Sequence, residues 1–526
     1  MRDLKQLRAI LASGSIDRRE FMRRATAIGV SGVMANSIVS QMAVAQTPKK
    51  GGHLILGLNG AGAGDSLDPA TYAATHVQVF GHQLYNLLIE TDDKVNLVPA
   101  LAESWEAKAG ATEWTLKIRK GVTFHNGKEL TAADVVYSLN HHRGKDSKSG
   151  ARSLFAPFVD ITASDKHEVT IKLDGANADL PYLLSEYHLC IGPEDTRFND
   201  GMGTGPFILE SFEPGVRGLT KRNPNYWRSD RGFVDSVETI AINDGNARLN
   251  ALVSGSAHLI NRLDPKTVGT LKENKTVQIF EISGSSHYSF AMRCDAAPFD
   301  NKDLRLALKY AVDREAIVKT VLLGHGKVGN DHPIPSFGPF YAADIPQTTY
   351  DPDMAKSHFK RSGHSGPIVL TVSDAAYIGA VDAAQIFQAS AAKAGIEIRL
   401  ERAPADGYWD NVWRKKPFCA TFWSGRPTAD LMLSVAYKSD ANWNETAWKR
   451  PDFDKLLVAA RSELDPAKRK PMYRELQLMI HDDGGVIIPM FNNTLDAGSS
   501  KVKGYVSNPT LQMSGYRAPE KVWLEV

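Results

Sequence analysis

The sequence predicts an α/β protein that is divided into two or more lobes. The chain has 526 residues, which is more than one hydrophobic core usually organises. Signals for helices and strands alternate along it, and this alternation favours α/β lobes. The apolar share of 43% and the charged share of 23% are those of an ordinary globular protein, with no repeat or low-complexity segment.

The first 45 residues have the pattern of an export signal. The arginine pair 18–19, with a phenylalanine two residues later, resembles the twin-arginine motif. The stretch 25–46 holds no charge and includes the small residues Ala43-Val44-Ala45, a typical cleavage pattern. We therefore expect export to the periplasm with cleavage after Ala45. A retained membrane anchor is the alternative, although polar residues in the stretch weaken insertion.

Two strands and a helix are predicted in the first part of the mature chain. Apolar and polar residues alternate over 114–118 and again over 169–173, which predicts two half-buried strands. Between them, Thr131 is followed three residues later by Asp134, a pattern that typically begins a helix.

The second half of the chain contains two predicted helices and a buried strand. Helical spacing over 303–321 predicts one helix capped by Asp303. The Asp-Pro pair 465–466 opens another helix, in which Pro471 should produce a kink or a restart. The apolar run 486–491 predicts a buried strand.

Glycine-rich and aspartate-rich segments mark turns and hinges. Gly127 follows His-Asn, which predicts a tight turn with a positive φ. The motif Gly-Thr-Gly-Pro at 203–206 predicts a close crossing of two chain segments. The segments 198–206, 283–300 and 481–486 are candidate lobe boundaries or hinges.

Charge and cysteine content exclude some classes of function. Residues 1–45 hold seven Lys or Arg against three Asp or Glu, whereas the remaining chain has a slight negative excess. We therefore expect no basic surface for nucleic acid. Cys190, Cys294 and Cys419 form no CxxC pair, so no zinc or iron–sulfur framework is visible. At most one disulfide is possible, and we interpret all three as buried, unreactive thiols.

A secreted enzyme and a metal or haem carrier are the alternatives to a binding protein. The sequence contains no GxSxG, HExxH or Walker-type motif, and no pair of carboxylates stands out as an acid–base couple. His141 and His142 are the only adjacent histidines, and successive helical side chains point about 100° apart, so both rarely bind one ion. Because twin-arginine export carries folded cargo, a cofactor-loaded carrier stays open. We expect no catalytic centre and no cofactor.

Several segments of the mature chain carry motifs in a recognisable order. They are KKGGHLILGLNG, SLDPA, LYNLLIE, LVPALAESWEA, WTLKIRKGVTFHNGKELTAADVVYSL, GTGPFIL, RNPNYW and FDNKDLRLALKYAVDRE. Together they resemble bacterial solute-binding protein family 5, the dipeptide, oligopeptide and nickel type of ABC importer receptors. The resemblance covers nearly all of the mature chain.

The resemblance implies a two-lobed periplasmic-binding-protein fold with an extra subdomain in the first lobe and hinge closure on the ligand. It also implies a monomer that captures a small polar organic ligand, such as a peptide, a peptide-like molecule, an opine or a sugar conjugate, and delivers it to inner-membrane ABC permease subunits. The expected divisions are a signal at 1–45, lobe I at 46–90, 199–290 and 485–526, the extra subdomain at 91–198, and lobe II at 291–484.

An aromatic-rich loop is the candidate ligand site. Five of the nine tryptophans lie between 409 and 448, and tryptophan and tyrosine suit pocket walls because they combine apolar area with a polar group. In α/β folds, binding groups gather where strands end near a cleft. The expected contacts are Trp423, Ser424, Gly425 and Arg426, with Tyr408, Trp409 and Asp430 nearby.

Arg426 sets this loop apart from that of the peptide-binding members. Those members carry an aspartate that pairs with the α-amine of the peptide, and alignment on Pro427-Thr428 puts Trp423 at its position, with Asp430 close but shifted. The guanidinium of Arg426 favours a ligand with a carboxylate or phosphate, and Trp423 favours a stacked sugar-like group. A salt bridge from Arg426 to Asp430 or to another neighbour is the alternative.

Four further residues are secondary candidates for the site. His287 and Tyr288 lie at the expected crossing into the second lobe. His287 is either a pH-sensitive contact or a buried polar residue with its own partners. Asp65 and Ser66 lie at the N-terminal turn, where a purely structural role is the alternative.

Overall fold

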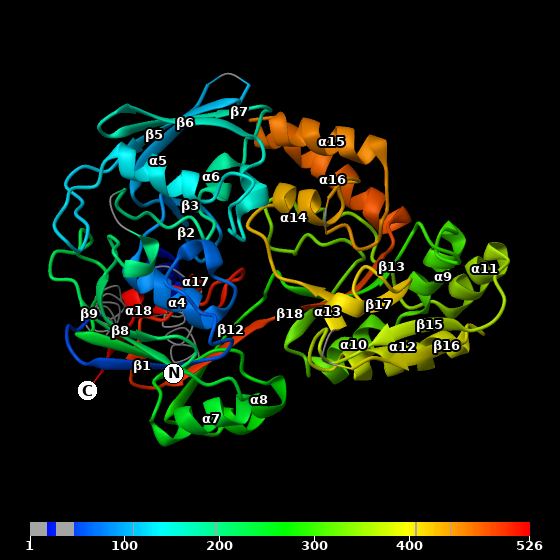
Figure 1. Ribbon diagram of the computed structural model, residues 1–526. Coiled ribbons are helices and arrows are strands. Elements are labelled where there is room, and N and C mark those ends of the chain that lie inside the picture. Colours follow the sequence, from blue (N-terminus) through cyan, green and yellow to red (C-terminus); the bar gives the residue numbers. More distant parts are fainter. Residues whose placement is uncertain are drawn as a thin grey trace.

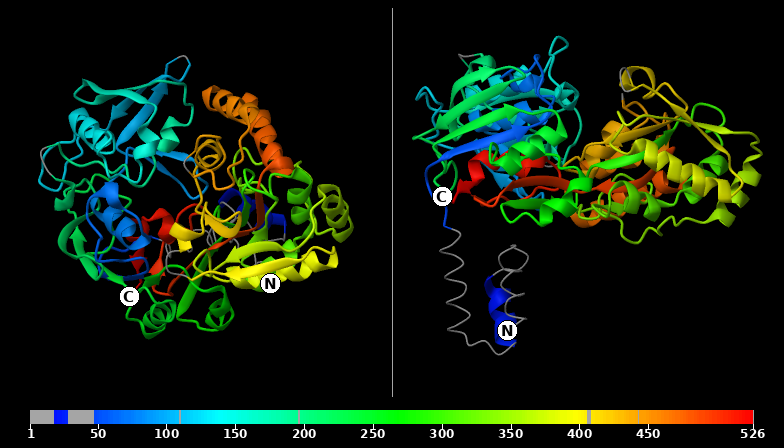
Figure 2. Two further views of the ribbon diagram at one scale, coloured as in Figure 1. Left: turned by 45° about the vertical axis from the view of Figure 1, so that its right-hand side comes forward. Right: turned by 90° about the horizontal axis from the view of Figure 1, so that it is seen from below.

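The computed structural model describes residues 18–27, 47–108, 110–194, 197–404, 408–441 and 443–525. Two α/β bodies lie side by side in Figure 1, and both views of Figure 2 separate them again. We call the body built on the seven-stranded sheet lobe I and the body built on the six-stranded sheet lobe II. The predicted two-lobed α/β fold is confirmed.

Most of the predicted export signal lies outside the described residues. One helix of it is described, α2 (Arg18–Ala27), which includes the twin arginines. The predicted cleavage position after Ala45 is not described. Within the described part of the chain, no helix has both the length and the apolar character needed to cross a bilayer.

Lobe I is organised by a mixed sheet in the strand order β12-β19-β11-β1-β10-β9-β8. The apolar side chains of β1 point into a core with Val79 and Phe207, which fixes the strand at the centre of the lobe. Its strands are β1 (His53–Leu58), β8 (Phe207–Glu213), β9 (Arg217–Arg222), β10 (Ser236–Ala241), β11 (Leu259–Ile260), β12 (Val277–Ile282) and β19 (Thr494–Ser499). Its other elements are η1 (Pro69–Thr71), α4 (Thr75–Leu84), η3 (Phe198–Asp200), α7 (Gly245–Ser254), α8 (Pro265–Lys272), β20 (Val502–Lys503), α17 (Gln512–Gly515), α18 (Ala518–Lys521) and β21 (Trp523–Leu524).

The extra subdomain has its own sheet and its own hydrophobic core. Both predicted strands are confirmed, and they pair with each other as neighbours in the order β4-β5-β7-β6. The predicted helix start is also confirmed, because Asp134 Oδ2 accepts a hydrogen bond from the Thr131 backbone N–H at 2.8 Å. The elements are β2 (Ile89–Thr91), β3 (Leu97–Pro99), β4 (Ala102–Ala107), β5 (Glu113–Ile118), α5 (Ala132–His141), η2 (Arg152–Phe155), β6 (Phe158–Asp165), β7 (Glu168–Leu173) and α6 (Leu180–Leu183).

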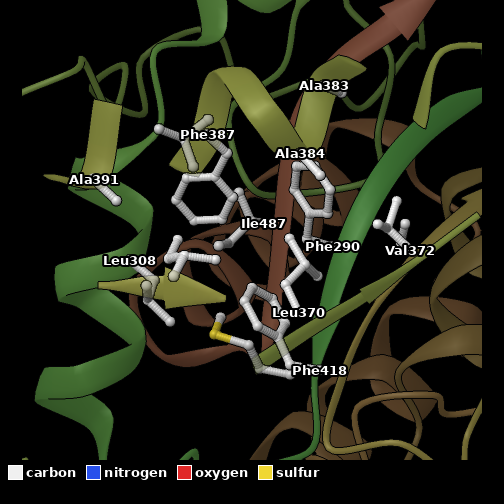
Figure 3. Packing of buried hydrophobic residues seen from close by; sticks show 14 of the residues in the cluster. Phe290, Leu308, Leu370, Val372, Ala383, Ala384, Phe387, Ala391, Phe418 and Ile487 are labelled. Atoms are coloured by element: carbon white, nitrogen blue, oxygen red, sulfur yellow. The ribbon is translucent and has the colours of Figure 1, made fainter. Parts of the chain in front are cut away.

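Lobe II is built on a sheet in the order β14-β18-β13-β17-β15-β16. Phe290, Leu370, Phe387, Phe418 and Ile487 converge in its core from the strands and from α12, as Figure 3 shows. The strands are β13 (His287–Met292), β14 (Gly326–Val328), β15 (Ile368–Val372), β16 (Ile398–Arg402), β17 (Phe418–Trp423) and β18 (Val486–Asn492). The helices are α9 (Lys302–Ala311), α10 (Arg314–Val321), α11 (Pro352–Ser362), α12 (Ala380–Lys393), α13 (Tyr408–Asn411), α14 (Ala429–Ala436), α15 (Pro451–Ser462) and α16 (Pro466–Asp483).

The prediction of one helix over 303–321 is wrong. The chain forms two helices, α9 and α10, because Val312 is extended and the Asp313 side chain caps a new helix by accepting from the Ala316 N–H at 2.9 Å. The cap of α9 is Asn301, whereas Asp303 lies in the first turn and pairs with His358. Because the hydrophobic periodicity continues across the break, the sequence pattern does not reveal where α9 ends.

The predicted start of α16 and the predicted strand β18 are confirmed. Asp465 caps α16 and Pro466 occupies its first turn, as predicted. The helix continues through Pro471 as one element, so the predicted restart does not occur. The predicted strand over 486–491 is confirmed as β18, and it is buried along almost its whole length.

Two adjacent chain segments, which we call the crossing strands, connect the lobes. One runs from β12 to β13 and the other from β18 to β19, and the Asn492 N–H bonds to the Ser286 carbonyl across them. A side chain at Gly284 would meet the Asn492 carbonyl at 2.4 Å, so glycine allows this close approach.

At both crossings the chain leaves one sheet and enters the other, and the positions of these changes differ from the predicted domain boundaries. Residues 287–290 and 486–492 belong to the lobe II sheet, although the sequence assigned both ranges to lobe I. We propose accordingly that lobe II extends from about β13 to β18.

Candidate functional site

The loop after β17 is pressed against the crossing strands. A Cβ on Gly425 would lie 1.6 Å from the Ser285 Oγ, so this position excludes every residue but glycine. Beyond the loop, Thr428 caps α14 by accepting from the Leu431 N–H at 3.1 Å. The cap and the close contact together fix where the intervening Arg426 can project.

Replacing Gly425 with alanine is expected to lower the free energy of unfolding by about 1–3 kcal/mol, because Ser285 is buried and has no space to withdraw. Urea denaturation measures the difference. Gly269→Ala is the matched control, since nothing lies within 4 Å of the added methyl group. Equal stability of the two variants would contradict the packing argument.

Arg426 is a cation that lies between the lobes without a carboxylate partner. Its guanidinium donates to the carbonyls of Ser424 and Gly425, at 3.2 Å and 3.1 Å, and forms no ion pair with a described residue. The residue is partly buried, and it lines a small cavity together with Val95 and Thr510, which belong to the other lobe. Burial lowers the pKa of Arg426.

The residues that oppose this pKa shift come from lobe I. They are Tyr187, Glu186 and Tyr516, whose electrostatic effect on Arg426 favours the charged form. Glu186 is already engaged, because its carboxylate pairs with His188 at 2.9 Å. The two phenol rings meet edge to face at 5.6 Å. Arg426 is therefore within electrostatic reach of lobe I, and because it forms no ion pair with a described carboxylate, its charge is available to an anion.

Tyr516 lies on a left-handed turn. Met513, Ser514 and Tyr516 have φ values of 51°, 59° and 64°, a conformation that costs non-glycine residues energy. Asp496 holds the turn by accepting from the Met513 N–H at 2.8 Å and from the Tyr505 hydroxyl. Such strain collects at functional sites, where the surrounding structure maintains it.

The alternative in which Arg426 pairs with Asp430 is not what the structure shows. Asp430 pairs with Arg461 at 3.1 Å on the side of α14 and α15. Burial raises the pKa of Asp430 to about 6. The sequence could not separate the two arginines, because the choice depends on how α14 and α15 pack.

Trp423 has a partner inside lobe II. It is 5% exposed, and its indole N–H donates to Glu445 Oε1 at 3.0 Å. The same carboxylate accepts from Trp413 at 2.6 Å and from the Thr421 hydroxyl at 3.0 Å. Burial raises the pKa of Glu445, and these three donors oppose the shift. This network supports the strand that carries the loop.

Replacing Glu445 with glutamine is expected to cost about 1–3 kcal/mol of stability, because an amide supplies one acceptor oxygen and leaves a buried donor without a partner. Thermal and urea unfolding test this, with the exposed Glu397→Gln as the control. Unchanged stability with unchanged tryptophan fluorescence would rule out a supporting role for the network.

Three other predicted residues lie around the same strand. Tyr408 is buried behind β17 and donates to the Ala420 carbonyl at 2.8 Å. Trp409 is partly exposed and packs edge-on against Phe422 at 5.5 Å. Ser424 is exposed next to Arg426.

The secondary candidates lie apart from one another. His287 is buried beside Trp423 in the adjacent strand, and burial lowers its pKa to about 3. Tyr288 points to the opposite face and stacks on Tyr377 at 4.1 Å. At the N-terminal turn, Asp65 accepts from the Gly62 N–H at 3.1 Å within the turn, whereas Ser66 donates to Asn199 at 2.6 Å and so ties the turn to η3.

Metal-ligand geometry was also searched in the structure. No group of three or more His, Cys, Asp or Glu residues gathers as a metal site in the described ranges. The two adjacent histidines have different partners, since His141 pairs with Asp68 and His142 with Ser149, while their rings meet edge to face at 5.6 Å. The three cysteines are free, with Cys190 and Cys419 buried and Cys294 partly exposed.

A second contact joins the lobes on the far side from the crossing strands, and Figure 1 shows α15 and α16 beside the extra subdomain there. Arg469 of α16 donates two hydrogen bonds to Asp179, each of 2.8 Å, and both side chains are over 90% buried. Next to this pair, the Ala178 N–H donates to the Arg461 carbonyl at 2.8 Å. We call these residues the rim contact. Sequence reasoning missed it, as it missed Tyr187 and Tyr516, because no local pattern marks a residue that meets a distant helix.

Comparison with known proteins places the chain among binding proteins. The sequence model of bacterial extracellular solute-binding proteins, family 5 Middle, matches residues 96–445. Heme-binding protein A of Haemophilus influenzae is 27% identical over 83% of this chain and 86% of that protein. The dipeptide-binding protein of Escherichia coli is 26% identical over 84% of this chain and 88% of that protein.

Solved structures share the fold. The periplasmic binding protein DppA of Helicobacter pylori, in complex with the peptide STSA, superposes with a TM-score of 0.76 at 23% identity, over 91% of this chain and 99% of that one. HbpA2 of Haemophilus parasuis gives a TM-score of 0.79 at 21% identity, over 90% and 100%.

Proposed function

The chain belongs to the bacterial extracellular solute-binding proteins of family 5, and on this premise we propose that it is the substrate-binding component of an ABC importer for a small organic anion. The importer's membrane subunits are then its protein partners. Delivery needs no chemistry at the site, since closure on the ligand follows from tighter binding in the closed state.

The unpaired Arg426 between the lobes is the observation that carries this proposal. A guanidinium that forms no ion pair with any carboxylate of the described residues gains most from a carboxylate or phosphate with hydrogen-bonding neighbours. Among relatives and structural neighbours, glutathione-binding proteins and a binding protein in complex with agropinic acid both have acids as their ligands. We infer a peptide-like, opine-like or sugar-linked acid for this chain.

Export and assembly belong to the same proposal. The twin arginines and the uncharged stretch that follows support export as a folded protein, with removal of the signal after Ala45. We propose that the mature protein acts in the periplasm as a monomer and turns over no substrate.

The proposal is tested by identifying what the protein carries. The mature chain is purified from the periplasm, its bound molecules are released with acid, and they are identified by mass spectrometry. We expect one acidic small molecule in stoichiometric amount, whose return raises the unfolding midpoint by mass action. A neutral or purely cationic ligand, or consumption of the added molecule, would refute the proposal.

A further inference from the structure

A row of four side chains crosses the lobe II sheet at its edge nearest lobe I. Lys327 of β14 is opposite Phe491 of β18, Phe491 is opposite His287 of β13, and His287 is opposite Trp423 of β17. Opposite residues on neighbouring strands share a face, so the four side chains form one line. Arg426 follows Trp423 by three residues, so the row has a cation near each end, with about 14 Å of sheet between the end strands.

A cavity of about 260 Å³ lies over the Lys327 end of the row. Its walls come from the crossing strand at Ser283 and Gly284, from Lys327 and Phe491 of the row, and from the covering segment with His332 and Tyr341. Among the residues that the structure describes, no aspartate or glutamate lines it. A smaller cavity shares Ile334 and Pro335 with it and includes Arg426, so the two cavities are neighbours.

His332 is a buried polar group that lacks a protein partner. It is 1% exposed, and neither ring nitrogen is hydrogen-bonded to a described residue. An unpaired buried polar group costs free energy, so a hydrogen-bond partner located in the cavity would stabilise His332. Burial lowers the pKa of His332 to about 4, so the ring is neutral at pH 7 and has one N–H to donate.

The backbone before His332 is held in a strained position. Asp331 has a φ of 54°, and it is fixed by Arg314, which donates to its carboxylate at 2.6 Å, and by the Ile488 N–H at 2.9 Å. The Arg314–Asp331 pair is almost fully buried. The backbone next to His332 is therefore fixed before any ligand arrives.

Lys327 supplies the charge. Its ammonium group reaches the Ser336 hydroxyl at 3.4 Å, and no carboxylate of a described residue lies within ion-pair distance. An ammonium, an imidazole N–H and hydroxyl groups around a cavity without acids attract an anion.

We propose that this cavity is a second anion subsite, in which Lys327 and His332 bind a carboxylate or phosphate group of the transported molecule. The inference rests on the proposed import function, and it narrows the ligand class to acids with two anionic groups, one near Arg426 and the other at Lys327.

Inorganic phosphate is the probe for the test, with the histidine rings of the full mature chain followed by NMR and His332→Gln used to assign the signal. We expect phosphate to shift the His332 resonance in a saturable way at millimolar concentration, and Lys327→Met to weaken the midpoint about tenfold. Lys319→Met, an exposed lysine on α10, is the matched control and should leave the midpoint unchanged.

A shift that does not saturate, or a midpoint that Lys327→Met leaves unchanged, would overturn the subsite. The variant Arg426→Met separates the two proposals, because the phosphate midpoint at His332 should stay the same when the other end of the row is removed. If the carried molecule proves neutral but phosphate still titrates His332 through Lys327, the import proposal fails and the anion subsite stands.

Discussion

Arg426→Met is expected to weaken binding of the acid recovered with the protein about a hundredfold while the fold stays intact. Each charge-assisted hydrogen bond to a carboxylate contributes about 1.5–3 kcal/mol, so loss of two such bonds from the guanidinium corresponds to about a hundredfold at the lower end of that range. The side chain makes no ion pair with a described protein residue, and its contacts are with its own loop. Its removal therefore takes away little folding energy.

Calorimetric titration of the purified protein measures this effect. Arg399→Met is the matched control, because Arg399 is an exposed arginine on the outer strand β16. Arg426→Lys should recover part of the affinity, since an ammonium keeps the charge but not the two-pronged geometry. Wild-type affinity in Arg426→Met would remove the observation on which the proposed function rests.

Breaking the rim contact is expected to have the second large effect. Asp179→Asn leaves the buried guanidinium of Arg469 without its charged partner, and loss of one member of a buried pair costs about 3–5 kcal/mol. When the lobes separate, both groups regain water. The cost therefore falls on the closed form, and ligand affinity should decrease about a hundredfold or more with faster dissociation.

Stopped-flow dissociation and small-angle scattering of the loaded protein report on this closure. The double variant Asp179→Asn with Arg469→Met should recover part of the lost affinity, because it removes the unpaired charge as well. Lys470→Met, on the exposed side of the same helix, is the control. If Asp179→Asn lowers the stability of the ligand-free protein and leaves dissociation unchanged, the rim contact is part of the fold and does not govern closure.

The two expected effects act at different places. Arg426 acts on the ligand directly, whereas the rim contact joins Asp179 and Arg469 on the side away from the crossing strands. Their effects on affinity should therefore add, because the sites share no partner. Strong coupling between the two substitutions would indicate that the ligand itself orders the rim.

Individual helices and strands could be predicted from the sequence where the sequence pattern and the local structure depend on the same few residues. The alternation over 114–118 and the capping pair Thr131 and Asp134 gave β5 and the start of α5, since side-chain period and cap contacts are local. The break between α9 and α10 was missed because the apolar spacing continues through it, while the cap at Asp313 ends the first helix.

The sequence alone determined the family, the α/β fold and the loop around Arg426, because ordered motifs, periodicity and an unusual charge can all be read along one chain. Only the tertiary structure decided that Asp430 pairs with Arg461, that Trp423 donates to Glu445, and that Tyr187 and Tyr516 come within electrostatic reach of Arg426. These contacts join residues that are far apart or face different ways. Their partners are chosen by how helices and lobes pack, a choice that no local spacing records.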